Sequence, residues 1–201
     1  MEKNERIEVL IDEETLSKRI HQLAEIINED YKGKNPVFIC TLKGAVFFFT
    51  DLTRLLNMDC ELAFMKAESY SGENSTEEVN ITVDIDRSIK GKDVVIVEDI
   101  IDTGLTLPKV IDKLCEKEPN SVSVCVLLDK PSRRKNHDIT PDYTGFVIPG
   151  RFVIGYGLDY NEKYRTLPNI SCIVKDDDPD LEKDRESIKK QLTLNSRKRV
   201  H

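Results

Sequence analysis

Acidic and hydroxyl side chains gather in a short stretch near the middle of this chain of 201 residues. Glu98 and Asp99 end an apolar run, and Asp102 precedes the turn Thr103-Gly104-Leu105-Thr106. The amides and hydroxyls of such a turn can bind a phosphate, and its glycine lets the backbone approach the phosphate oxygens closely. Because carboxylates repel phosphate, the acidic pair must face sugar hydroxyls, a divalent cation, or both. The stretch therefore predicts a site for a phosphorylated sugar, with an ordinary acidic strand-to-helix connection as the alternative.

The neighbouring segments would place these side chains between the end of a strand and the start of a helix. The apolar run 94–97 is typical of a parallel strand buried on both faces. After the turn, apolar residues recur at helical spacing at Leu107, Val110, Ile111 and Leu114. The first amides of a helix have no partner within it and can bind an anion. The chain has neither a P-loop nor a dinucleotide-binding glycine motif, which excludes those phosphate sites.

Length, charge and cysteine usage indicate the class of protein. The 201 residues are most simply one domain with one substantial core. The net charge of −7 and the pI of about 5.2 disfavour bulk electrostatic binding to nucleic acid. The five cysteines form no Cys-x-x-Cys pair, which is typical of buried, reduced thiols. The polar residues 1–8 predict no signal segment, and apolar runs such as 45–49 are far too short to span a membrane. We therefore expect a cytoplasmic protein.

Hydrophobic spacing predicts the remaining elements. A helix is expected over 12–31, capped by Asp12 or Glu13 and ended by Lys32-Gly33. A buried strand over 36–42 leads through Lys43-Gly44 into a helix over 45–57, which repeats the order of strand, tight turn and helix. Further strands are expected over 61–69, 79–85, 121–128 and 169–175, with 79–85 at an edge.

The segment 93–107, DVVIVEDIIDTGLTL, resembles the phosphoribosyl-pyrophosphate motif of the type I phosphoribosyltransferases. Its part from 98 to 104 has the form typical of the hypoxanthine-guanine members. The resemblance covers about residues 8–175 and implies an α/β fold with a central, mostly parallel sheet flanked by helices. It also implies a small hood formed by the N- and C-terminal parts, and a mobile lid loop. Residues 1–175 would form this domain, and 176–201 a charged extension that is a solvated tail, a surface helix or a docking segment.

The resemblance implies a reaction in purine salvage. The N9 atom of hypoxanthine or guanine would displace pyrophosphate from C1 of phosphoribosyl pyrophosphate, giving IMP or GMP, with Mg²⁺ as the cofactor. Thr103, Gly104 and Thr106 would hold the 5′-phosphate. Glu98 and Asp99 would face the ribose hydroxyls and the metal.

Four positions are expected to contact the purine. Asp102 is the candidate general acid and base, placed to exchange a proton with N7 of the purine. Lys130 follows the strand expected over 121–128, at the sheet edge where ligands bind in open α/β folds. Its ammonium can donate to a carbonyl oxygen but cannot accept from an amino group, which favours a 6-oxo purine over adenine. Phe152 and Val153 match the pair whose ring stacks on the base and whose main chain contacts the base edge.

The pyrophosphate and the lid are assigned by the same resemblance. Lys43-Gly44 would contact the pyrophosphate chiefly through main-chain amides, and Arg165 through its planar guanidinium. Asp159 matches a carboxylate that takes part in binding a second magnesium. Ser69 and Tyr70 match the pair in a lid that closes over the site and excludes water.

The sequence departs from the family pattern at two places, and three other functions are alternatives to purine salvage with hypoxanthine and guanine. Val83 stands where the family often has a lysine, and Gly150-Arg151 stand where an acidic residue usually precedes the aromatic pair. A phosphoribosyltransferase for xanthine or for a pyrimidine would keep the reaction, although pyrimidine enzymes lack the context of Lys130 and Phe152. A regulator that uses this fold to bind RNA would carry another residue at the Asp102 position, and the acidic charge disfavours it. The habit of the family implies a homo-oligomer, a dimer or a tetramer.

Overall fold

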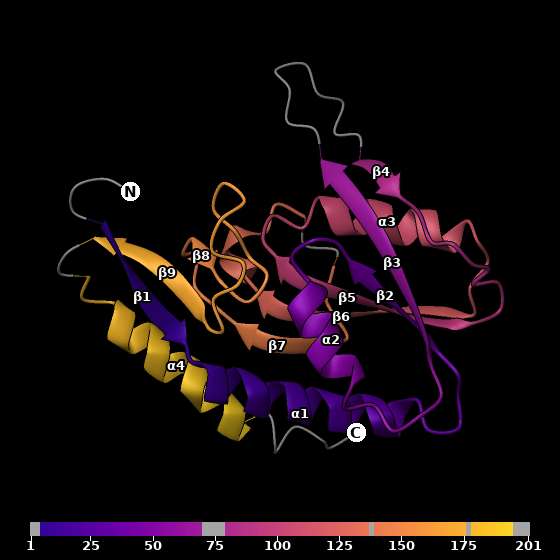
Figure 1. The fold of residues 1–201 in the computed structure, drawn as a ribbon, viewed down its shortest axis with the longest axis horizontal. Helices are drawn as coiled ribbons and strands as arrows, with labels where there is room; N and C mark the ends of the chain where they lie inside the picture. The colour runs from indigo at the N-terminus through magenta and orange to yellow at the C-terminus, as the bar shows by residue number, and fades with distance from the viewer. Residues whose placement is uncertain (1–4, 70–78, 137–138, 176–177, 195–201) are drawn as a thin grey trace.

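The computed structural model describes residues 5–69, 79–136, 139–175 and 178–194, and it contains a large and a small sheet (Figure 1). The large sheet has six strands in the order β4 (Val79–Val83), β3 (Glu61–Ser69), β2 (Val37–Thr41), β5 (Asp93–Ile101), β6 (Ser121–Asp129) and β7 (Tyr143–Val147). Neighbouring strands are parallel except for β3 and β4, which pair antiparallel at one edge. The predicted α/β fold with a mostly parallel sheet is thereby confirmed.

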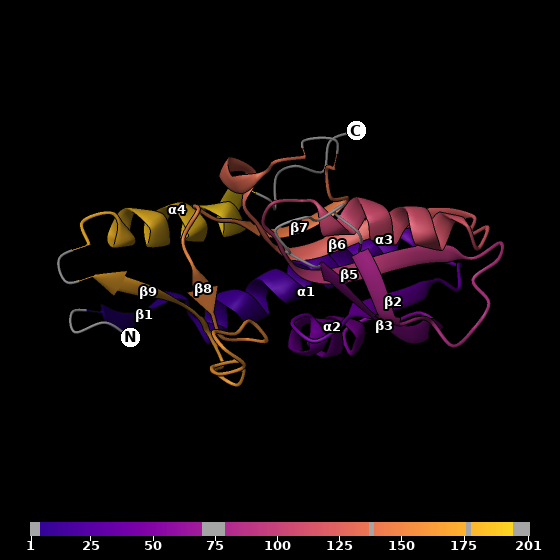
Figure 2. The ribbon, with the colours of Figure 1, turned by 90° about the horizontal axis from the view of Figure 1, so that it is seen from above.

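Helices cover both faces of this sheet (Figure 2). α1 (Glu13–Asp30) and α2 (Val46–Thr53) pack on one face, and α3 (Thr106–Cys115) packs on the other. Within β5, Val95 and Val97 join the first cluster, whereas Val94 and Ile96 join the second. Because both faces are buried, the strand has a continuous apolar sequence. No helix among the described residues is long and apolar enough to cross a membrane.

A hood lies at one end of the large sheet (Figure 1). Its sheet has three antiparallel strands in the order β1 (Glu5–Ile11), β9 (Ile170–Lys175) and β8 (Val153–Ile154). The first and last strands of the chain therefore lie side by side, as predicted for a hood formed by the N- and C-terminal parts. α4 (Leu181–Leu194) contacts β1 of the hood, β7 of the large sheet and α1.

Local sequence signals account for the bounds of α1 better than for those of α2. The side chain of Asp12 accepts a hydrogen bond from the Thr15 amide at 2.8 Å, which caps α1 as predicted. α2 ends at Thr53, although its spacing predicts a helix to residue 57. The Asn28 side chain of α1 donates to the Leu55 carbonyl at 3.2 Å and accepts from the Asn57 amide at 2.9 Å. These tertiary hydrogen bonds hold 55–57 in a turn, which the spacing does not reveal.

Candidate functional site

A pocket of about 210 Å³ lies at the carboxyl end of β5 and the start of α3. It is lined mainly by the β5–α3 connection together with the end of β2: Thr41, Leu42, Ala67, Glu98, Ile100, Ile101, Asp102, Thr103, Gly104, Leu105, Thr106, Leu107 and Val110. The strand β5 extends beyond its apolar run to Ile101, so Glu98 and Asp99 lie within the strand rather than after it. The pocket gathers five of the six residues expected to bind the ribose and its phosphate or to transfer the proton.

The turn at the pocket floor has the features of an anion site. Gly104 has a φ of +73°, a conformation that favours glycine, and the carbonyl of Thr103 accepts hydrogen bonds from the amides of Lys135 and Asn136. Leu105 occupies the N-cap of α3 and makes no side-chain cap hydrogen bond. The first amides of α3 therefore remain available to a bound anion.

The acidic pair carries charge that its surroundings do not fully compensate. Burial, followed by the charge of Asp99, raises the pKa of Glu98 well above its ordinary value of 4.5. Burial raises the pKa of Asp99 as well, although the Ile100 amide donates to its Oδ1 at 2.8 Å and Arg165 opposes the shift. Sugar hydroxyls or a cation at this place would stabilise the ionised pair.

The donor set suits a magnesium ion that is completed by substrate. Among the described residues, no group of three or more His, Cys, Asp or Glu side chains could hold a metal ion. Mg²⁺ is typically bound by one or two carboxylates together with waters and substrate phosphates. Glu98 and Asp99 therefore fit a substrate-completed Mg²⁺ site rather than a metal site built from protein ligands alone.

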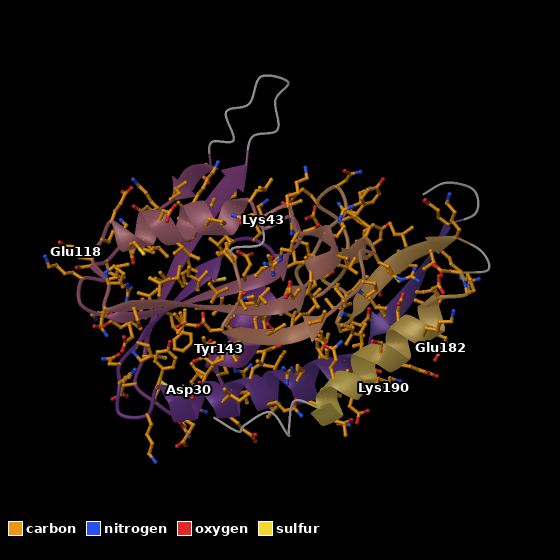
Figure 3. The ribbon with its side chains drawn as sticks, turned by 180° about the vertical axis from the view of Figure 1, so that it is seen from behind. Asp30, Lys43, Glu118, Tyr143, Glu182 and Lys190 are labelled. Atoms are coloured by element: carbon orange, nitrogen blue, oxygen red, sulfur yellow. The ribbon has the colours of Figure 1, made fainter. Side chains whose placement is uncertain are left out.

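Two loops meet tightly beside Asp99. A Cβ atom on Gly44 would lie 1.6 Å from Oδ2 of Asp99, and one on Gly157 would lie 1.8 Å from the Gly44 carbonyl oxygen. Only glycine fits at these two contacts. Lys43 lies between the large sheet and the hood (Figure 3), and its Nζ is 3.0 Å from Oε2 of Glu162. The structure thus joins the Lys43-Gly44 turn to the loop that follows β8.

Arg165 anchors that loop and keeps one donor free. Its Nη1 donates to the Gly157 carbonyl at 2.7 Å, and its Nη2 lies 2.8 Å from Asp159 and 3.2 Å from Glu162. The Nε atom is buried without a hydrogen-bond partner among the described residues. A buried donor without a partner costs about 1–3 kcal/mol, which an anionic ligand oxygen would offset. The carboxylate of Asp159, expected at a second magnesium, is engaged by this arginine and by the Glu162 amide.

Lys130 and Asp102 lie together at the ends of β6 and β5. The Lys130 side chain is buried, and its Nζ is 3.3 Å from Oδ2 of Asp102. Burial lowers the pKa of Lys130, and the charge of Asp102 opposes that shift. Arg133, in the short helix η1 (Pro131–Arg133), places its Nε 3.1 Å from the other oxygen of Asp102. Asp102 is therefore held between two cationic side chains.

The residues expected to bind the base are placed differently from each other. Phe152 is 53 % exposed, and its ring meets Tyr160 edge to face at 5.6 Å between centroids. Val153 is buried in β8 and pairs with Cys172 of β9. Ser69 is the last residue of β3, and Tyr70 lies outside the described residues, so the expected lid stays a prediction.

Comparison with known proteins identifies the family. A family model described as "Phosphoribosyl transferase domain" matches residues 9–161. A hypoxanthine-guanine-xanthine phosphoribosyltransferase from Tritrichomonas foetus is 45% identical over 82% of this chain and 90% of that protein. This chain belongs to the phosphoribosyltransferase family. A hypoxanthine phosphoribosyltransferase from Escherichia coli (strain K12) is 46% identical over 84% of this chain and 96% of that protein.

Solved structures place the fold in the same phosphoribosyltransferase family. A crystal structure of a hypoxanthine-guanine phosphoribosyltransferase from Bacillus anthracis has a TM-score of 0.79 and 45% identity, and the match covers 83% of this chain and 98% of that one. One of a hypoxanthine phosphoribosyltransferase from Staphylococcus aureus has a TM-score of 0.80 and 43% identity, covering 83% and 91% of the two chains. The predicted resemblance is confirmed.

Sequence reasoning missed several residues around this phosphoribosyltransferase site. Arg133 has no role in the sequence analysis, although it forms an ion pair with Asp102. Arg134 places Nη2 2.5 Å from Asp129 and donates to the Ile139 carbonyl, beneath the turn that holds Gly104. The doublet Arg133-Arg134 directly after Lys130 was the available signal. Gly157 and Glu162 gave no signal, because only the tertiary contact with the Lys43-Gly44 turn reveals them.

Proposed function

We propose that this protein transfers the 5-phosphoribosyl group from phosphoribosyl pyrophosphate to N9 of hypoxanthine and of guanine, giving IMP and GMP and releasing pyrophosphate. One observation carries the proposal beyond family membership. A buried lysine and a carboxylate, Lys130 and Asp102, form an ion pair of 3.3 Å beside the anion-binding turn of the β5–α3 connection. A donor for O6 and an acceptor for the N7 proton of a 6-oxo purine are thereby available together. The names of the relatives from Tritrichomonas foetus and Escherichia coli support the same base class.

Binding of the sugar phosphate follows from the pocket. The free amides at the start of α3 and the hydroxyls of Thr103 and Thr106 would donate to the 5′-phosphate, and Gly104 allows its close approach. Glu98, which lines the pocket, and Asp99, which lies next to it beside Gly44, would accept from the ribose hydroxyls. Mg²⁺ at these carboxylates would supply neutralisation of charge on the leaving pyrophosphate.

The leaving group would be held at the junction of two loops. The main chain of Lys43-Gly44 faces this junction, and the unpartnered Nε of Arg165 can donate to a pyrophosphate oxygen. Asp159 would contribute to a second Mg²⁺ only if Arg165 shares its carboxylate. The substrate therefore spans from the β5–α3 turn to the loop after β8.

The chemical step is a substitution at C1 of the ribose. The N9 lone pair of the purine forms the new bond as the bond from C1 to the pyrophosphate oxygen breaks, and the electron pair leaves with pyrophosphate. The proton carried by N7 of the incoming base would move to Asp102, so the product ring is neutral. Lys130 would donate to O6, and the exposed ring of Phe152 would stack on the base.

Pyrophosphate release measured with one base at a time tests the proposal. Purified protein, phosphoribosyl pyrophosphate and Mg²⁺ are combined separately with hypoxanthine, guanine, xanthine, adenine and uracil. We expect turnover with hypoxanthine and guanine and none with adenine or uracil. Turnover with xanthine alone would replace the proposed bases, and absence of turnover with every base would reject the proposed reaction.

A further inference from the structure

α4 is joined to the segment that carries the expected base-binding residues. The helix follows β9, beyond residue 161 where the match to the family ends. Figure 1 and Figure 2 show it alongside the hood and reaching the large sheet. Its apolar side is anchored, since Leu181 and Ile188 are buried in the main core cluster. Glu182 and Lys190, by contrast, are labelled on the surface of the helix in Figure 3.

Arg151 forms an ion-pair network with two aspartates at the start of this helix. Its Nη1 and Nη2 lie 2.5 Å and 3.0 Å from the two oxygens of Asp178, and its Nε lies 2.5 Å from Asp184. The three side chains are only 18%, 19% and 20% exposed. A planar guanidinium that meets carboxylates through three donors has a fixed orientation as well as a fixed position. Asp178 also accepts from the Asp180 amide at 3.1 Å, which connects the network to the first turn of α4.

The network has electrostatic effects on both partners. Hydrogen bonds to Asp178 raise the pKa of Arg151, and the hydrogen bond from Arg151 lowers the pKa of Asp178 to about 2. Both groups are therefore charged at neutral pH, as the ion pair requires.

The segment that Arg151 belongs to depends on such contacts for its shape. Residues 148–152 between β7 and β8 form neither helix nor strand, and Phe152 and Val153 follow Arg151 directly. On the other side, a Cβ atom on Gly150 would lie 3.2 Å from Cδ of Arg133, the residue that binds Asp102. The segment therefore lies between the acidic start of α4 and the cation beside the candidate acid and base.

Two further contacts fix α4 on the two sheets. The Gln191 side chain accepts from the Val147 amide at 2.9 Å and donates to the Val147 carbonyl at 2.7 Å. Arg185 donates to the Val9 carbonyl at 2.7 Å and lies 3.2 Å from Glu8. Because α4 is held at β7 and at β1, the Arg151 network connects the base segment to a helix that is itself immobilised.

We propose that α4 is a positioning element for base recognition, acting through Asp178 and Asp184 on Arg151 and so on the placement of Phe152 and Val153. This inference rests on the proposed function for its kinetic consequence. Arg151 does not touch the reacting atoms and is a positioning residue. Loss of the network releases the segment 148–152. Binding of the purine must then also order the segment that carries Phe152, and this ordering costs free energy. The Michaelis constant for the purine then rises, whereas phosphoribosyl pyrophosphate binds at a site that the segment does not form.

The test compares variants at the two ends of the network with a matched control. Arg151→Gln and the double variant Asp178→Asn/Asp184→Asn remove the ion pairs, and Arg151→Lys keeps the charge with fewer donors. Lys190→Gln is the control, because it removes a charge from an exposed position of α4 and leaves Arg151 and the described contacts of α4 with both sheets untouched. We expect the first two to raise the KM for hypoxanthine about tenfold, equivalent to 1.4 kcal/mol. The KM for phosphoribosyl pyrophosphate should change less than about twofold, and Arg151→Lys should give an intermediate purine KM.

Hydrogen exchange of the amides in 148–154 supplies a readout that does not need activity. We expect faster exchange there in Arg151→Gln and in the double aspartate variant, and unchanged exchange in Lys190→Gln. The inference is overturned if the purine KM or the exchange of 148–154 is unchanged in the Arg151 and aspartate variants, or if Lys190→Gln changes them equally. If Arg151→Gln does not fold, Asp184→Asn alone, which leaves the Asp178 pair, is read by the same criteria. An inactive wild-type protein would reject the proposed function, while the exchange data would still decide the role of α4.

Discussion

The Nζ atom of Lys130 lies 3.3 Å from Oδ2 of Asp102. The Lys130 side chain is 5% exposed and the Asp102 side chain is 37% exposed, so the ion pair has a buried end and an accessible end. Arg133 approaches the other oxygen of Asp102 from the solvent side at 3.1 Å. An incoming purine at the proposed site would therefore share Asp102 with two cations, and the proposed proton acceptor and O6 donor are positioned by one another.

Removal of the proposed proton acceptor should slow the chemical step while preserving binding of the sugar phosphate. Asp102→Asn keeps the size of the side chain but cannot take the N7 proton. We expect the single-turnover rate with hypoxanthine to fall by about 10²–10⁴-fold. The dissociation constant for phosphoribosyl pyrophosphate, measured by calorimetry with Mg²⁺, should change less than about threefold, because the phosphate turn is intact. A single-turnover rate equal to that of the wild type would rule out Asp102 as the general acid and base.

Replacement of Lys130 should weaken selection of the 6-oxo group. Lys130→Gln removes the ammonium from O6 and leaves Asp102 with Arg133 as its cationic partner. We expect kcat/KM for hypoxanthine to fall about 10–100-fold, as for loss of a charged hydrogen bond in a buried site. Lys113→Gln, at an exposed lysine of α3, serves as the control. Equal losses in the two variants would contradict the assignment of Lys130 to the base.

The close contact at Gly44 predicts a larger effect from a methyl group than from loss of a lysine. Gly44→Ala would place Cβ 1.6 Å from Oδ2 of Asp99, so the turn and the acidic side chain must both move. Lys43→Ala removes a side chain whose partner, Glu162, is 67% exposed, and such surface pairs contribute about 0–1 kcal/mol. We expect a loss of at least about 100-fold in kcat/KM for phosphoribosyl pyrophosphate in Gly44→Ala and less than about tenfold in Lys43→Ala. The reverse order would show that the lysine, not the main chain, binds pyrophosphate.

The raised pKa of Glu98 predicts that replacing this residue by a neutral one stabilises the fold while lowering activity. Its folded pKa is raised above 4.5, so the folded state binds more protons than the unfolded state as pH rises beyond that value. The stability that Glu98 contributes is therefore complete below its unfolded pKa and is lost as pH rises through the folded pKa. Glu98→Gln should raise the melting temperature of the ligand-free protein at about pH 7.5 and change it little near about pH 4, while lowering activity.

Calorimetric melting across that pH range checks the Glu98 prediction. Glu25→Gln, at an exposed position of α1, is the matched control and should show no such pH dependence. A melting temperature of Glu98→Gln that follows the wild type at every pH would contradict an unfavourable charge at this site.

The conformation of the turn at 103–106 could be predicted from sequence because its information is local. The strand β5 with its two carboxylates, the turn and α3 follow one another directly in the chain. The end of each element therefore defines where the next one begins. Asp12 likewise caps α1 through an amide three residues away. Where backbone pattern and side-chain chemistry occupy the same segment, the predicted and observed structures agree.

The remaining contacts join residues that are distant in sequence, and no periodicity encodes them. Arg151 contacts Asp178 and Asp184 only because the segment before β8 folds against the start of α4. The charges after residue 175 predict a solvated tail, a surface helix or a docking segment without deciding between them, since charge alone does not reveal a partner. Gly44 also requires the fold, because its need for glycine comes from the Asp99 side chain of β5 rather than from its own backbone. Gly157 has a positive φ of +104° of its own, and its close contact with the Gly44 carbonyl is equally absent from the sequence pattern.

The two helices that flank β7, α1 and α4, occupy hydrogen-bonding groups at the outer edge of this strand. β7 is the outermost strand of the large sheet, and an open strand edge is a template for pairing with another chain. Arg19 of α1 donates to the Gly145 carbonyl at 2.6 Å, and Gln191 of α4 occupies both the amide and the carbonyl of Val147. Side chains thus take the hydrogen-bonding places of a further strand. Truncation after residue 175 would uncover the Val147 end of this edge, so the shortened protein should aggregate more readily than the full chain.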